Sequence, residues 1–163
     1  MIGLFGDDTP PPAPPGSGAA GSIRGVSLWQ PWATLMDLGA KRRETRSWST
    51  TFRGWLLIHA AKRWTREQQQ ISAESPFRGA IAGGKLPLGC LLCVVRVVDC
   101  QAIRANLPSD RGELAFGDYQ PGRFQWITDR VVRIPTPIPF LASQGFFDVP
   151  RGIIPAPVLE QLT

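Results

Sequence analysis

The sequence predicts an α+β fold in which a small mixed β-barrel is surrounded by two or three helices. Three observations lead to this expectation. The chain has 163 residues, which is the size of one compact domain. Its extended apolar runs cluster along the chain instead of alternating regularly with helices, and its helical segments are short. This arrangement favours a mixed barrel over a doubly wound parallel sheet.

The first helix is expected directly after a short extended run at 26–30. Pro31 suits the first position of a helix, and the apolar residues that follow have the i, i+3, i+4, i+7 spacing of a helical face. Gly39 is expected to end this helix.

Two strands and a polar helix are expected next. The segment 43–48 reads as a strand, and 55–61 as a buried central strand, because 55–61 is apolar on both faces except at His59. Thr65 could cap a short helix that runs to about residue 73, and a loop is expected over 79–86.

The remaining strands are predicted from β-branched and aromatic runs. Residues 88–99 form the strongest strand signal in the chain. A strand pair with a turn at 128–130 is expected within 122–134, and the prolines that follow demand extended chain. A closing strand at 144–149 and a short helix at 156–162 complete the pattern.

The chain divides into a leader, 1–22, and a domain, 23–163. The leader holds five prolines and five glycines without helical or strand periodicity, so we expect it to be disordered. No apolar run is long enough to span a bilayer, and no signal peptide is recognisable, which predicts a cytoplasmic protein with no membrane partner. Three closely spaced cysteines fit a reducing compartment better than a disulfide framework.

Positive charge is concentrated in one region. The chain has a net charge of +5, yet residues 41–66 contain eight basic residues and one acidic residue. Tryptophan and phenylalanine side chains are interleaved with these cations, a combination that suits phosphates and unpaired bases. The alternative interpretation is a solvated surface over buried aromatic residues.

Metal and redox chemistry find little support in the sequence. Cys90 and Cys93 are three apart on a predicted strand, so they face opposite sides, and His59 is the sole histidine. No phosphate-binding glycine loop of a nucleotide hydrolase is present. We therefore expect no metal and no cofactor.

The segment 39–48 holds the strongest candidate site. It places Lys41 just beyond a helix and sets Glu44 and Arg46 on one face of the following strand, where they are expected to form an ion pair. Arginine can bind a phosphate or a base edge, lysine can supply a charge or a base, and glutamate can orient either. The alternative is a structural salt bridge in the barrel wall.

Five motifs occur in a recognisable order along the chain. They are S-L-W-Q-P-W-A at 27–33, G-x-K-x-x-E-x-R-S-W at 39–48, R-G-x-L-L-I-H-A-A-K at 53–62, P-G-R-F-Q-W at 121–126 and Q-G-F-F-D-V-P at 144–150. Together they resemble the ASCH family of the PUA-like superfamily, over roughly residues 24–150. The resemblance implies a small β-barrel with packed helices that binds RNA, another nucleic acid or a modified nucleoside.

The resemblance also implies a cleft beside the Lys-x-x-Glu-x-Arg strand. The ligand-binding residues expected there are Gln30, Pro31, Trp32, Lys41, Glu44, Arg46, Trp48, His59 and Lys62. His59 has the alternative role of a hydrogen-bonded core histidine, and Trp126 is expected in the core.

Two other functions remain open. Some relatives in this family are hydrolases of RNA or of modified nucleosides, and Lys41 and Glu44 would then be the catalytic pair. Glu44 stands where the amidohydrolase relatives have threonine, which argues against that activity. A module that binds an acidic protein through its basic face is the third hypothesis.

Overall fold

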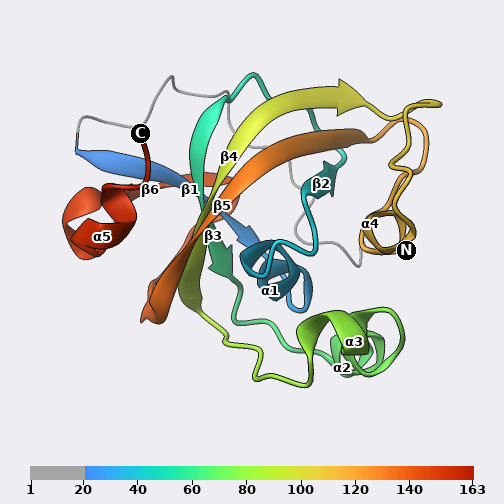
Figure 1. Ribbon diagram of the computed structural model, residues 1–163, viewed down its shortest axis with the longest axis horizontal. Coiled ribbons are helices and arrows are strands. Elements are labelled where there is room, and N and C mark those ends of the chain that lie inside the picture. The colour runs from blue at the N-terminus through green and yellow to red at the C-terminus, as the bar shows by residue number, and fades with distance from the viewer. Residues whose placement is uncertain (1–20) are drawn as a thin grey trace.

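The computed structural model describes residues 21–163, so the predicted leader lies almost entirely outside the described residues. Figure 1 shows a strongly curved sheet with helices on both sides. The elements in chain order are β1 Ser22–Leu28, α1 Trp32–Asp37, β2 Arg43–Arg46, β3 Gly54–Ala60, α2 Arg66–Ala73, α3 Phe77–Ile81, β4 Cys90–Ala102, α4 Arg111–Ala115, β5 Phe124–Pro139, β6 Phe146–Pro150, a 3₁₀ turn Arg151–Ile153 and α5 Ala156–Leu159.

The six strands form one mixed sheet in the order β2-β5-β4-β3-β1-β6. β1 and β3 run parallel, and the other neighbouring pairs are antiparallel. The long strands β4 and β5 bend across the molecule and give the sheet the form of a half-barrel (Figure 1). The predicted mixed α+β class is therefore confirmed.

Aromatic side chains close the concave face between the two edges of the sheet. Trp48, which follows β2, contacts Trp126 of β5 and Phe146 of β6, with ring centroids 4.5 and 5.5 Å apart. Trp126 is 1% exposed, as expected for a core residue. Ala33 and Met36 of α1 pack into the same cluster, so α1 covers this inner face.

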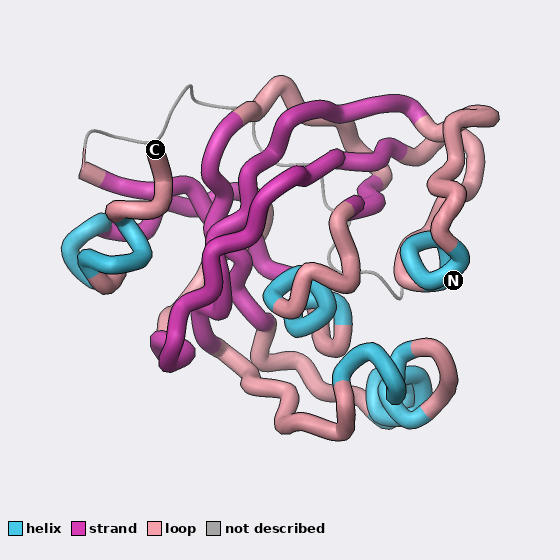
Figure 2. Tube along the Cα trace, in the orientation of Figure 1, coloured by secondary structure: helices cyan, strands magenta, loops and turns pink. Residues whose placement is uncertain are grey.

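The opposite face of the sheet has a separate core. Leu57, Val94 and Val132 from the three central strands pack there against Ile154 and Val158 of the C-terminal segment. Figure 2 shows the α5 helix on the side of the sheet away from α1. The sheet therefore has an inner face under α1 and an outer face that α5 covers in part.

Local sequence signals account for two of the helices. α1 ends before Gly39, whose φ of +71° is a left-handed conformation that glycine adopts freely. Thr65 caps α2 through a capping box in which Gln68 returns the hydrogen bond. Both helices were expected at these positions.

The turn predicted at 128–130 is wrong, because β5 continues through it. Thr128 donates its backbone N–H and its hydroxyl to the Arg42 carbonyl oxygen, at 2.9 and 2.8 Å. The Asp129 carboxylate accepts hydrogen bonds from Arg96 on β4. The polar residues that suggest a turn in the sequence therefore bond to the neighbouring segments, Thr128 to Arg42 and Asp129 to β4.

The loop expected at 79–86 is wrong in its first part, and there are more helices than expected, five in the described residues. Phe77 and Ile81 occupy one face of α3 and pack beside Trp32, with the Trp32 and Phe77 centroids 6.0 Å apart. α4 is capped by Asp110, whose carboxylate accepts the Glu113 N–H at 2.7 Å. Its five residues are too short for a periodic signal.

None of the helices in residues 21–163 has the length and apolar character to cross a membrane. The cytoplasmic location stays a prediction. The division at residue 22 also stays a prediction, although β1 already includes Ser22.

Candidate functional site

Three predicted site residues form a continuous chain of ion pairs, here called the buried ion triad: Lys41, Glu44 and Arg46. One Glu44 carboxylate oxygen lies 3.2 Å from Lys41 Nζ, and the other lies 3.0 Å from Arg46 Nε. The three residues are 2, 5 and 2% exposed. Two cations and one anion are therefore held away from bulk water, where ion pairing offsets part of the desolvation cost.

The triad connects β2 to β1, two strands that are not hydrogen-bonded neighbours in the sheet. The Arg46 guanidinium donates to the Ser27 carbonyl oxygen of β1 at 2.9 Å and stands 5.9 Å from the ring centroids of Trp48 and Trp126. Lys41 donates to the Arg43 carbonyl oxygen. These contacts connect β2 to β1 across the open side of the half-barrel. A structural salt bridge in the barrel wall, the alternative interpretation of these residues, would make the same connection.

His59 lies next to the triad through Ser27. Its Nε2 is 2.9 Å from the Phe140 carbonyl oxygen, which can only accept, so Nε2 carries the proton and Nδ1 accepts from the Ser27 hydroxyl at 2.9 Å. Burial lowers the pKa of His59, the Phe140 contact partly opposes this, and Lys62 lowers it further. The ring, 4% exposed, is therefore neutral at pH 7.

Gln30, Pro31 and Trp32 fix the start of α1. The Gln30 side chain is fully buried, donates to the Thr34 hydroxyl at 2.8 Å and accepts the Thr34 N–H at 3.0 Å. The Gln68 amide of α2 donates to the Gln30 carbonyl oxygen at 2.8 Å. Trp32 is 2% exposed, so these residues connect α1 to α2 within the core.

Two sets of cations, most of them exposed, lie near the two ends of α1. The first set follows β3 and includes Lys62, Arg63 and Arg66, with Trp64 36% exposed between them; residues 62–66 are called the basic segment below. The Arg63 guanidinium is 4.8 Å from the ring centroid of Trp29, the residue three before α1. This is a cation–π contact at the surface.

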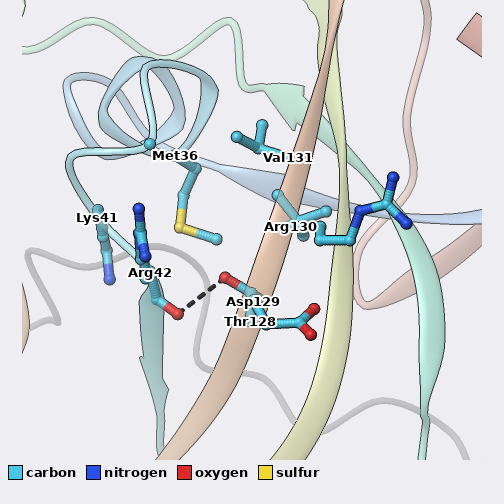
Figure 3. A pocket seen from close by; sticks show the side chains of 9 residues that line it. Met36, Lys41, Arg42, Thr128, Asp129, Arg130 and Val131 are labelled. Atoms are coloured by element: carbon cyan, nitrogen blue, oxygen red, sulfur yellow. Dashed lines mark hydrogen bonds between the residues drawn. The ribbon is translucent and has the colours of Figure 1, made fainter. Parts of the chain in front are cut away.

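The second set follows α1 and borders a pocket of about 360 Å³. Arg42 and Arg43 line it together with Glu113, which accepts both of their backbone N–H groups at 2.8 and 2.9 Å. Figure 3 shows a smaller cavity beside it, about 40 Å³, between Met36 and the Thr128 hydrogen bond to Arg42.

The predicted residues thus fall into different environments. The structure joins Lys41, Glu44 and Arg46 directly, and connects them to His59 through Ser27. Trp48 is 8% exposed, whereas Lys62 is exposed.

Trp29, Arg63 and Trp64 were not among the predicted ligand-binding residues, although Arg63 and Trp64 lie in the basic region 41–66 that was predicted to suit phosphates and bases. A signal for them existed. The run Lys62-Arg63-Trp64 directly follows a buried strand, where the chain must return to the surface.

The cysteines have the environment of core residues. Cys90 and Cys93 are buried, and burial raises the pKa of both thiols, which keeps them protonated. Within residues 21–163, no three His, Cys, Asp or Glu side chains come together in an arrangement suited to a metal ion.

Comparison with known proteins agrees with the motifs. Residues 26–128 match the ASCH domain family. Activating signal cointegrator 1 from Homo sapiens and from Mus musculus are each 38% identical to this chain over 82 residues. The matched segment is 46% of this chain and 14% of each relative, so the chain corresponds to a small part of those proteins. Because the family match covers more than half of the sequence, the chain belongs to the ASCH domain family.

Proposed function

We propose that this ASCH domain binds single-stranded RNA, or a modified nucleotide within it, through the basic segment 62–66 and Trp29. The observation that carries the proposal is the contact of Arg63 with Trp29, 4.8 Å from guanidinium to ring centroid, in a segment of exposed cations. Aromatic rings beside cations suit nucleic acid, since bases stack on rings and phosphates pair with cations.

The unpaired state of the cations in the basic segment supports a polyanionic ligand. Within the described part of the chain, Lys62, Arg63 and Arg66 form no ion pair with a carboxylate. Their charge is therefore available to phosphates, whereas the cations of the triad are already paired with Glu44.

In this proposal the buried ion triad positions the binding surface. It holds β2 against β1, and the second set lies at the start of β2, where Arg42 is exposed and Arg43 is half-buried. α1 has six residues and is about 9 Å long, so the two sets of cations flank one short helix. A nucleotide at the second set would lie beside the strand that contains Glu44 and Arg46.

The test is fluorescence anisotropy of a labelled single-stranded RNA at about 50 and 200 mM salt. The variant Lys62→Gln with Arg63→Gln removes two exposed cations. Arg104→Gln with Arg111→Gln removes the same charge from exposed positions outside the basic segment. The logarithm of the binding constant falls linearly with the logarithm of the salt concentration, and each phosphate contact contributes about 0.7 to the steepness of this slope. The slope of the Lys62/Arg63 variant should therefore be smaller by about 1.4.

Equal binding by the Lys62/Arg63 variant and the Arg104/Arg111 control would contradict this site. Each endpoint is also run on a denaturing gel. We expect the RNA to remain intact. If the unmodified protein shortens the RNA and the Lys41→Met variant does not, the protein is a hydrolase and the binding proposal is wrong.

A further inference from the structure

We propose a second phosphate-binding surface on the outer face of the sheet, formed by Arg53, Arg96, Arg130 and Arg151 around Trp55. It is called the outer arginine surface here. RNA as its ligand rests on the proposed function, but the site is separate from the basic segment. Trp55 packs against the outer core, whereas Trp29 packs against the cluster that contains α1 and α3.

The centre of this surface is a row across three neighbouring strands. Trp55 of β3 pairs in register with Arg96 of β4, and Arg96 pairs with Arg130 of β5. Directly paired residues share a face, and adjacent strands are about 4.8 Å apart. Both guanidinium groups lie over the indole, at 5.9 and 5.2 Å from its centroid. Figure 3 shows the Arg130 side chain directed across the sheet, away from Met36 of α1.

The row leads to a pocket at the beginning of β1 and β3. This pocket has a volume of about 180 Å³ and contains the side chains of Arg24, Arg53 and Arg151 beside the rings of Phe52 and Trp55. It is smaller than the usual range of about 300–1,000 Å³ for organic ligands, which suits one phosphate group with part of its ribose.

The charges at this surface favour an anion despite nearby carboxylates. Arg53 lies 3.2 Å from Asp99, and Arg96 Nε lies 2.8 Å from Asp129. All four of these side chains are 37–44% exposed. The single contact of Arg53 is a weak surface pair, so a phosphate can compete for this guanidinium group, whereas Arg96 contacts both carboxylate oxygens of Asp129 and is held more firmly.

Deeper in the pocket, the buried Arg24 pairs with the exposed Asp148 at 3.1 Å. Among residues 21–163, Arg130 and Arg151 form no ion pair. These two guanidinium groups are therefore the ones most available to a ligand.

The ligand class follows from the geometry of the donors. Guanidinium groups bind phosphate oxygens in a two-pronged arrangement, and indole holds them in place without neutralising them. A row of such groups that ends in a phosphate-sized pocket suits successive phosphates of one strand. RNA that is long enough to reach from the basic segment to the outer face would contact both surfaces.

The experiment uses the full chain and two labelled RNAs, of about 6 and 24 nucleotides, because single domains of this size contact roughly 4–16 nucleotides. The variant Arg130→Gln with Arg151→Gln tests the outer arginine surface, and Arg104→Gln with Arg111→Gln is the charge-matched control. We expect the outer variant to bind the long RNA at least fivefold more weakly, with a salt slope reduced by about 1.4. Binding of the short RNA should change by less than twofold, as should both RNAs with the control.

Comparison with the Lys62/Arg63 variant separates the two proposals. Loss of long-RNA binding in that variant with no loss in the Arg130/Arg151 variant would overturn the outer surface and leave the proposed function intact. Loss in the Arg130/Arg151 variant alone would support the outer surface and contradict the basic segment. DNA of the same sequence as competitor distinguishes a general phosphate surface, which it would displace, from a ribose-specific one.

Discussion

Replacing Glu44 by glutamine should strongly destabilise the protein. The substitution keeps the size of the side chain but removes the single anion between Lys41 and Arg46, whose distances to it are 3.2 and 3.0 Å. Both cations are 2% exposed, so water cannot replace the lost partner and two like charges remain close together. Removing one member of a buried ion pair costs about 3–5 kcal/mol of unfolding free energy.

Urea denaturation followed by tryptophan fluorescence measures this loss. With a slope of about 2 kcal/mol per molar urea, the midpoint should fall by about 1.5–2.5 M. Asp129→Asn is the matched control, because it removes the anion from the Arg96 pair, whose side chains are 37 and 41% exposed. That variant should lose less than about 1 kcal/mol.

A double variant tests the coupling directly and guards against a Glu44→Gln protein that does not fold. Lys41→Met with Glu44→Gln leaves one buried cation without its anion instead of two, so it should be more stable than Glu44→Gln alone. The reasoning would be refuted if Glu44→Gln cost no more than Asp129→Asn, or if the two changes in the triad were additive.

Three further predictions follow from particular contacts. His59 is neutral in the folded protein because burial lowers its pKa, whereas the unfolded chain takes up a proton near pH 6.5, so its contribution to stability is present above that pH and lost below it. His59→Gln should therefore cost more at pH 7 than at pH 5 in urea denaturation, and an equal cost would argue against a neutral ring. Gly25→Ala would place a Cβ 2.6 Å from a Phe147 ring carbon and should lower stability by about 1–3 kcal/mol, whereas Gly152→Ala meets nothing within 4 Å and should be close to neutral in thermal unfolding. Thr65→Ala removes the α2 cap and should cost about 1 kcal/mol, while Thr65→Ser should retain most of it.

Much of the fold could be predicted because its signals are local. Helix α1 with Gly39, the cap at Thr65 and the β-branched run of β4 are each visible within a few residues. The continuity of β5 through Thr128 could not be predicted, since it depends on the carbonyl of Arg42, 86 residues away in the sequence.

The candidate site was predicted in part for the same reason. Glu44 and Arg46 share a strand face, and Lys41 lies three residues before Glu44, so their association could be predicted from spacing. Their burial could not, because it depends on Trp126 of β5 and on Ser27 of β1, which the fold brings against Arg46 from distant parts of the chain. The exposure of a side chain depends on how the whole sheet is assembled. Lys41 and Arg46 are buried in the assembled sheet, whereas the cations of the basic segment are exposed.

The prolines of β5 have a consequence for how the molecule behaves at high concentration. β2 pairs only with residues 124–127 of β5, so the remainder of that side, through Pro139, has no strand beside it in the described structure. Alternate residues of a strand direct their N–H groups to the same side, and Pro135, Pro137 and Pro139 are alternate residues. The three prolines remove the donors that a strand from another molecule would need in order to add there. The proline rings themselves therefore protect the side of β5 that has no neighbouring strand from edge-to-edge aggregation, and no helix is needed to cover it.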